Sequence, residues 1–335
     1  MMHEPPYPTV LKPYGRALVE LAAERPEILC LSGDLTRQCE ADLFAEAYPD
    51  RFILAGMAEA NMMSMAGALA REGFQPWVHT FGVFATRRPF DQIVNSIAYP
   101  NLPVRLIGFM PGVSTPGGPS HQAIEDVAIM RALPNMTVID VADAVQIEQV
   151  VPEIADLPGP VYLRLKRGEI PVIFDDTHRL RVGPVQPLLD GAELCLVTSG
   201  MMLPATLAAA RLLREHGVAA GVVNAPTLKP FDAPGLLAAL DGTRGVISIE
   251  NHTIIGGLGS CVAETLAEAG VGVPLRRIGL DDTFAEGSKT APYLFEKYGL
   301  SSQRIVNTAW ELLALAGAAP TVVQPETEAG EYAPV

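Results

Sequence analysis

Short runs of β-branched and other apolar residues alternate along the chain with longer stretches rich in Ala and Leu. The short runs are typical of buried strands, and the longer stretches have the spacing of helices. This alternation predicts an α/β fold of two domains, each a mostly parallel sheet flanked by helices. We expect strands at residues 28–31, 51–54, 75–79, 104–109, 136–141, 161–165, 194–198, 219–223, 245–250 and 275–278. We expect helices at residues 14–24, 58–71, 83–98, 123–133, 144–154, 202–216, 235–240, 259–269, 291–297 and 302–315.

A segment rich in Asp, Arg, Gly and Pro at residues 174–189 divides this pattern into two halves. Such a composition is typical of an exposed linker, so we expect one domain over residues 1–180 and another over 190–318. Residues 319–335 carry Pro, Glu and Gly without periodicity, which predicts a flexible tail. No signal peptide and no apolar run of the ~18 residues needed to span a bilayer is visible.

Composition and charge narrow the possible partners. The 335 residues are 49% hydrophobic and 19% charged, which excludes a disordered or fibrous protein. The net charge of −14 would repel phosphate backbones and anionic membranes, so we expect neither as a partner. The four cysteines are far apart and form no C-x-x-C pair. They are typical of free thiols in a reducing compartment, and we expect a cytoplasmic protein.

Glu59 begins a helix whose next eleven residues, ANMMSMAGALA, carry no charge. It is interpreted either as an acid stabilised by the helix dipole or as a carboxyl in a dry site with a specific partner. Phe81, Phe84 and Arg87 recur every three residues at the start of the next helix. They are interpreted either as two core phenylalanines with a surface arginine or as a platform for a flat ring.

A loop rich in Gly and Pro, residues 111–120, follows a predicted strand and leads to His121. Ligands of open α/β sheets bind at the carboxyl ends of strands, where such loops lie. His121 is interpreted either as a solvent-facing residue at a helix start or as an acid–base group that works near neutral pH.

Several strings together resemble the transketolase family, which includes 1-deoxyxylulose-5-phosphate synthase, over residues 10–318. The strongest are GPSHQ at 118–122, ED at 125–126 and RALPNM at 131–136. SGDL at 32–35, MAEANM at 57–62, TFGVF at 80–84, IENH at 249–252 and GGLGS at 256–260 also fit. The resemblance implies a pyrimidine-binding domain of the thiamine diphosphate fold, followed by a transketolase C-terminal domain.

The resemblance also implies thiamine diphosphate as cofactor. Glu59 matches the family glutamate that hydrogen-bonds N1′ of the aminopyrimidine and so helps to remove the thiazolium C2 proton. His121 matches the histidine that contacts substrate hydroxyls near the reacting carbons, so Glu59 and His121 are the expected catalytic residues. The expected cofactor-binding residues are Asp34, Glu59, Phe81, Phe84 and Arg87.

Full-length members of the family carry a further domain in which a G-D-G…N motif binds the diphosphate through Mg²⁺ or Ca²⁺. The present sequence has no such motif. We therefore expect no metal ligands in this chain. The expected partner is a separate diphosphate-binding subunit that holds the metal, in an α2β2 heterotetramer whose active sites form between chains.

Three departures from the family concern the substrate. Transketolases have a serine in place of Gln38 and a histidine in place of Phe109, and both help to hold the substrate phosphate. An aspartate that contacts a substrate hydroxyl is replaced by Gly117. Arg167 still matches the family's phosphate arginine. We therefore expect a substrate that differs from ordinary sugar phosphates at its far end. The expected substrate-binding residues are His121, Arg164 and Arg167.

The expected activity is thiamine diphosphate-dependent transfer of a two-carbon ketol unit from a ketose donor to an aldehyde acceptor, as one subunit of a split transketolase. One alternative is the β subunit of a 2-oxo acid dehydrogenase E1 component, which shares the two-domain plan. The other is a non-catalytic regulatory partner.

Overall fold

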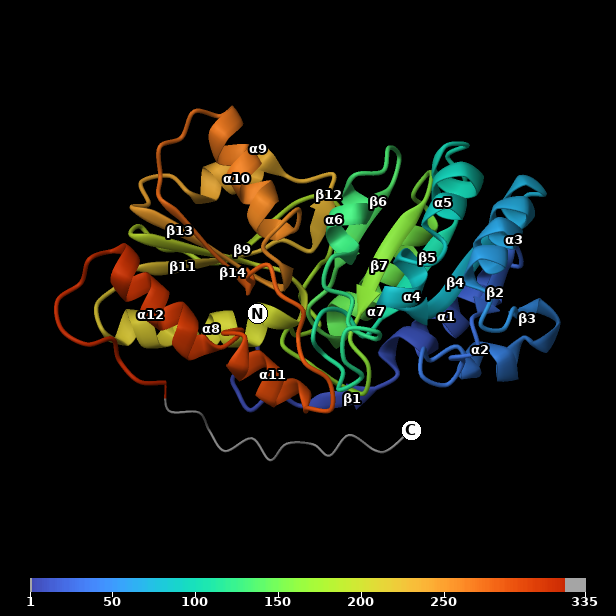
Figure 1. Cartoon of the computed structure of the whole chain (residues 1–335), viewed down its shortest axis with the longest axis horizontal. Coiled ribbons are helices and arrows are strands. Elements are labelled where there is room, and N and C mark those ends of the chain that lie inside the picture. Colours follow the sequence, from blue (N-terminus) through green and yellow to red (C-terminus); the bar gives the residue numbers. More distant parts are fainter. Residues whose placement is uncertain (1, 323–335) are drawn as a thin grey trace.

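Two mostly parallel sheets, each flanked by helices, lie side by side (Figure 1). The structure is a computed structural model that describes residues 2–322. The predicted α/β class with two sheet-based halves is confirmed. Within the described residues, every helix is too short or too polar to traverse a lipid bilayer.

The first sheet has seven strands in the order β12-β6-β7-β5-β4-β2-β3. Six of them come from the first half of the chain and run parallel, whereas β12 comes from the second half and pairs antiparallel with β6. The central strands are buried over their whole length, as expected for parallel strands covered on both faces. The strands are β2 (Ile28–Ser32), β3 (Phe52–Leu54), β4 (Gln75–Phe81), β5 (Arg105–Phe109), β6 (Thr137–Asp140), β7 (Val161–Leu165) and β12 (Thr227–Lys229).

Four of the five helices expected in this half are present as single helices, and α2 and η1 occur in addition to them. The helix expected over residues 83–98 is interrupted between α4 and α5, where Pro89 lacks the backbone N–H that would continue it, and it then changes from α5 to a π-helix at residue 93. The helices are α1 (Pro13–Glu24), α2 (Asp42–Ala47), η1 (Pro49–Arg51), α3 (Glu59–Arg71), α4 (Gly82–Thr86), α5 (Phe90–Gln92), the π-helix η2 (Ile93–Ala98), α6 (Asp126–Arg131) and α7 (Ala144–Ala155).

The second sheet has five strands in the order β14-β13-β10-β11-β9, and only β9 is antiparallel to its neighbour. Two short strands, β1 (Thr9–Leu11) and β8 (Glu169–Pro171), form a separate antiparallel pair. The strands of the second sheet are β9 (Gln186–Leu189), β10 (Leu194–Thr198), β11 (Ala220–Asn224), β13 (Gly245–Thr253) and β14 (Leu275–Leu280). The helices around it are η3 (Gly200–Met202), α8 (Leu203–Glu215), α9 (Ala233–Ala239), α10 (Leu258–Glu268), α11 (Ala291–Lys297) and α12 (Ser302–Leu312).

The segment between the halves, which the composition predicts to be an exposed linker, is partly buried. Phe174, Leu180 and Val185 are buried, and the segment ends in β9. Residues 319–322 of the predicted tail lie against α12, where Gln303 bonds the carbonyl of Pro320 and the amide of residue 322. The rest of the predicted tail, residues 323–335, lies outside the described residues.

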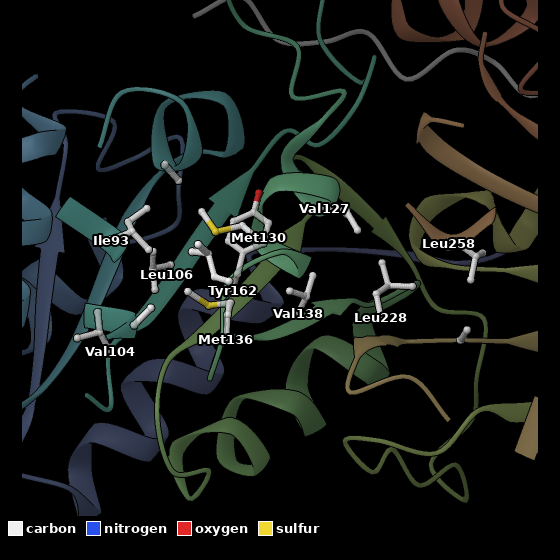
Figure 2. Packing of buried hydrophobic residues seen from close by; sticks show 14 of the residues in the cluster. Ile93, Val104, Leu106, Val127, Met130, Met136, Val138, Tyr162, Leu228 and Leu258 are labelled. Carbon is white, nitrogen blue, oxygen red and sulfur yellow. The ribbon is translucent and has the colours of Figure 1, made fainter. Parts of the chain in front are cut away.

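One apolar cluster continues from the first half into the second. Figure 2 shows Val127 and Val138 of the first half in the same cluster as Leu228 and Leu258 of the second. The two sheets are therefore joined by a shared core as well as by β12.

Candidate active site

The carboxyl ends of five adjacent strands meet at one edge of the first sheet. Asp34 follows β2, Glu59 follows β3, Phe81 ends β4, His121 follows β5 and Arg167 follows β7. Because these strands are parallel, their carboxyl ends share this edge. The fold thus gathers residues that lie more than a hundred positions apart in the sequence.

Glu59 is the first residue of α3, and its side chain is buried to 3% exposure. The apolar face of α3 packs into the core below it, and the helix N-terminus favours a carboxylate there. Arg88 Nη1 donates a hydrogen bond to Glu59 Oε1 at 2.9 Å. Glu59 is therefore a buried carboxyl with a specific cationic partner.

Phe81 and Phe84 form a stacked pair with ring centroids 6.0 Å apart and an interplanar angle of 18°. The imidazole of His121 meets this pair edge-on, with its centroid 5.3 Å from that of Phe84. The guanidinium carbon of Arg88 lies 4.2 Å from the Phe84 centroid. Arg88 thus links the buried carboxyl of Glu59 to the aromatic pair.

Arg87, which the sequence placed at the ring platform, has another set of partners. It pairs with Glu125 and donates hydrogen bonds to the carbonyl oxygens of Pro119 (2.8 Å) and Gln122 (3.0 Å). The hydrogen bond with Glu125 raises the pKa of Arg87. Arg87 therefore holds the loop that precedes α6. The arginine over the Phe84 ring is Arg88, which the sequence analysis did not single out, and the expected cofactor-binding role of Arg87 stays a prediction.

His121 lies at the end of the Gly- and Pro-rich loop, residues 111–120. Its Nδ1 is 2.8 Å from Ser120 Oγ, and its backbone N–H donates to the carbonyl of Gly118 at 2.9 Å. The imidazole is partly exposed, so its other ring nitrogen can serve a ligand at the edge of the sheet.

Arg164, an expected substrate-binding residue, is instead part of a buried ionic network. It is 1% exposed and lies between two buried carboxylates, with Nε 2.8 Å from Asp126 and Nη1 2.9 Å from Asp140. Burial opposes its charge, and the two carboxylates outweigh that effect, so its pKa lies above the ordinary value. Arg164 is therefore buried within β7 among partners from this chain, and its expected role in substrate binding stays a prediction.

Asp34 and Arg167 stand apart from the contacts that join the other residues. Asp34 is exposed and has a left-handed backbone with φ of 69°, which turns the chain out of β2. Arg167 is partly exposed beyond the end of β7. Both lie at the same edge of the sheet as Glu59 and His121, and their expected roles stay predictions.

The donor set fits a flat heteroaromatic cofactor. A buried carboxyl, Glu59, can hydrogen-bond a ring nitrogen, and the stacked Phe81 and Phe84 can cover the apolar face of the same ring. No group of His, Cys, Asp or Glu suited to a metal ion occurs in residues 2–322. The residues present therefore fit the pyrimidine half of thiamine diphosphate.

Comparisons with known proteins cover both halves of the chain. Residues 7–172 match the model of the transketolase pyrimidine-binding domain, and residues 183–305 match that of the transketolase C-terminal domain. An uncharacterized transketolase family protein (y4mN) of Sinorhizobium fredii is 45% identical over 303 residues, which are 89% of this chain and 87% of that protein. The 6-deoxy-6-sulfo-D-fructose transketolase subunit SqwH of Clostridium sp. (strain MSTE9) is 39% identical, over 89% of this chain and 92% of that one.

A solved structure is also similar. It is described as a split gene transketolase, inactive beta4 tetramer, and it is 41% identical with a TM-score of 0.83. The match covers 91% of this chain and 98% of that chain. This chain therefore corresponds in extent to a protein that is itself one part of a split enzyme.

Proposed function

This chain belongs to the transketolase family, and we propose that it is the pyrimidine-binding subunit of a split transketolase. With a separate diphosphate-binding subunit, it transfers a two-carbon ketol unit from a ketose to an aldehyde. The observation that carries the proposal is the joining of Glu59, the Phe81–Phe84 pair and His121 at one edge of the sheet. Thiamine diphosphate, when bound, supplies the chemistry that lets a carbon–carbon bond break and re-form.

The residues of this chain bind and orient the cofactor ring and the substrate. Glu59 holds a hydrogen bond at the pyrimidine nitrogen, and its burial keeps water away from that bond. Phe81 and Phe84 position the ring by stacking. His121 presents its imidazole to hydroxyl groups near the reacting carbons.

The partner completes the site. We propose that it supplies the ligands of Mg²⁺ or Ca²⁺ and the groups that hold the diphosphate, in an α2β2 assembly. In support, one relative is named as a subunit, and the similar solved structure of the isolated β chains is described as inactive.

The substrate departs from ordinary sugar phosphates at its far end. Phe109 is fully buried with its ring edge against Tyr14, so no cation stands there for a phosphate. A Cβ at Gly117 would lie 2.6 Å from the Cβ of His121. The loop therefore leaves no room at this position for an aspartate side chain that hydrogen-bonds a substrate hydroxyl. Arg167 stays available for an anionic end, which can be a phosphate, a sulfonate or a carboxylate. The relative that acts on 6-deoxy-6-sulfo-D-fructose by name supports this range.

Reconstitution tests the function. The isolated chain should give no measurable ketol transfer, and addition of a partner that carries the G-D-G…N motif should restore it. Glu59→Gln should lower turnover by at least about a hundredfold and slow C2 proton exchange of the bound cofactor, because the amide cannot hold the same proton. The matched control is Glu72→Gln, at the exposed other end of α3.

Two results would contradict the proposal. Ketol transfer by the purified chain alone would exclude the need for a partner. A complex that assembles without binding thiamine diphosphate would instead support the non-catalytic alternative.

A further inference from the structure

The loop that carries His121 is held by hydrogen bonds within itself, by Arg87 and by the second half of the chain. Its residues 111–120 are rich in Gly and Pro, and Gly112 and Gly118 have positive φ angles of 57° and 71°. Such residues leave the backbone conformation to be set from outside. The position of His121 therefore depends on what holds this loop.

Asn251, near the end of β13 in the second half, bonds the start of the loop with both ends of its amide. Its Nδ2 donates to the carbonyl of Pro111 at 3.1 Å, and its Oδ1 accepts from the N–H of Val113 at 3.0 Å. Asn251 is 2% exposed. A Cβ at Gly112, between the two bonded residues, would lie 2.1 Å from Oδ1, so the glycine permits this close approach.

Asn251 is itself firmly held. Its carbonyl accepts a hydrogen bond from Arg164 Nη2 at 3.1 Å, and Arg164 is fixed by Asp126 and Asp140. Two residues later, the N–H of Thr253 donates to the carbonyl of residue 124, just after the loop, at 2.7 Å. The end of β13 thus bonds the chain on both sides of the loop.

The middle of the loop is held by the second half as well. The N–H of Ser288 donates to the carbonyl of Pro116 at 2.7 Å, and Gln122 Nε2 lies 3.3 Å from the carbonyl of Glu286. On the apolar side, α6 follows the loop, and its Val127 belongs to the cluster that includes Leu258 (Figure 2). The second domain therefore contacts the beginning, the middle and the end of this loop.

We propose that Asn251 is a positioning residue for ketol transfer, which acts through Pro111 and Val113 on the loop that presents His121. The second domain thereby takes part in the reaction without touching the substrate. This inference rests on the proposed function.

The test compares Asn251→Ala and Asn251→Asp in the assembled two-subunit complex. The aspartate keeps the volume and the acceptor but turns a second oxygen toward the carbonyl of Pro111. Both variants should lower kcat/KM for ketol transfer by about ten- to a hundredfold, while C2 proton exchange of the bound cofactor stays within about twofold. That exchange depends on Glu59, which these changes leave in place.

The matched control is Asn224→Ala, a buried asparagine of β11 whose amide bonds Gln186 in the same sheet. It should cost similar thermal stability and leave kcat/KM unchanged. Unchanged kcat/KM in both Asn251 variants, or a parallel loss of transfer and proton exchange, would overturn the inference. Absence of exchange and transfer in the unmodified complex would overturn the proposed function instead.

Discussion

Arg88 makes the two contacts that the proposed function gives to the cofactor ring. Its guanidinium lies over the face of Phe84 and donates to the carboxyl of Glu59. The guanidinium of Arg88 is planar and donates hydrogen bonds, so it can occupy the place of a flat ring with a protonated nitrogen. Arg88 must therefore leave this place when the cofactor ring enters it.

Arg88→Ala should strengthen thiamine diphosphate binding to the assembled complex by about five- to thirtyfold, since a cation–π contact and a half-exposed ion pair are each worth about 0.5–1 kcal/mol. Isothermal titration measures the change in Kd. Arg71→Ala, at the exposed end of α3, is the control. Weaker binding by the Arg88 variant would mean that Arg88 supports the bound ring.

The sequence predicted the aromatic pair and the buried carboxyl, but it did not predict the contact of Arg88 with Phe84. The three-residue spacing from Phe81 through Arg87 assumes one continuous helix. In the structure Phe81 is the extended last residue of β4, and α4 spans only Gly82–Thr86, so these positions do not lie on one helix. The burial of Arg164 could not be predicted either, because its carboxylate partners come from other elements, α6 and β6.

At the scale of elements, α3 packs on η2 through Gly67. A Cβ at this position would lie 2.4 Å from the carbonyl oxygen of Ser96. Alanine ordinarily stabilises a helix interior by about 0.5–1 kcal/mol relative to glycine. Here the clash forces the two helices apart, which reverses that effect.

Gly67→Ala should therefore lower the free energy of unfolding by about 1–3 kcal/mol, as overpacked cores do. It should also weaken cofactor binding, because α3 carries Glu59 at its first turn. Urea unfolding and a cofactor titration measure the two effects. Gly272→Ala, which has no atom within 4 Å of its added Cβ, should change neither. Equal unfolding free energies and equal cofactor affinities in the two variants would show that the α3–η2 contact tolerates a methyl group.

Long, buried elements could be predicted from sequence, whereas four of the short strands could not. Strands such as β5 and β7 are mostly apolar, with one arginine each, and their expected positions agree with the structure to within a residue or two. In contrast, β1, β8, β9 and β12 have three or four residues each and were not predicted. Such strands exist because a distant partner pairs with them, which leaves no periodic signal in their own sequence.

At the scale of the whole molecule, the network around Arg164 joins both halves. Asp126 and Asp140 belong to the first half, whereas Ser199 and the carbonyl of Asn251 belong to the second. Burial raises the pKa of Asp140, against the lowering effect of Arg164. Removal of the guanidinium would leave two buried carboxylates without a counter-charge.

Arg164→Met should therefore lower the free energy of unfolding by about 3–5 kcal/mol, the usual cost of breaking a buried ion pair from one side. Calorimetry should detect both halves melting at the lower temperature, since each contributes to the network. The control is Arg244→Met, which removes an exposed pair with Glu193 worth about 0–1 kcal/mol. A loss of unfolding free energy as small as that of the control would contradict this expectation. It would mean that Asp126 and Asp140 become protonated or bind other partners in the variant.

Strand β12 limits how this protein can be dissected in the laboratory. It covers the edge of β6 that would otherwise end the first sheet, yet it is encoded almost ninety residues later. A fragment that stops before residue 183 would present the bare edge of β6 to other molecules, and bare edges recruit foreign strands. Such a fragment should aggregate on expression. Truncated proteins and chimaeras between relatives should therefore keep both domains together. Otherwise they should include Thr227–Lys229 with the first domain.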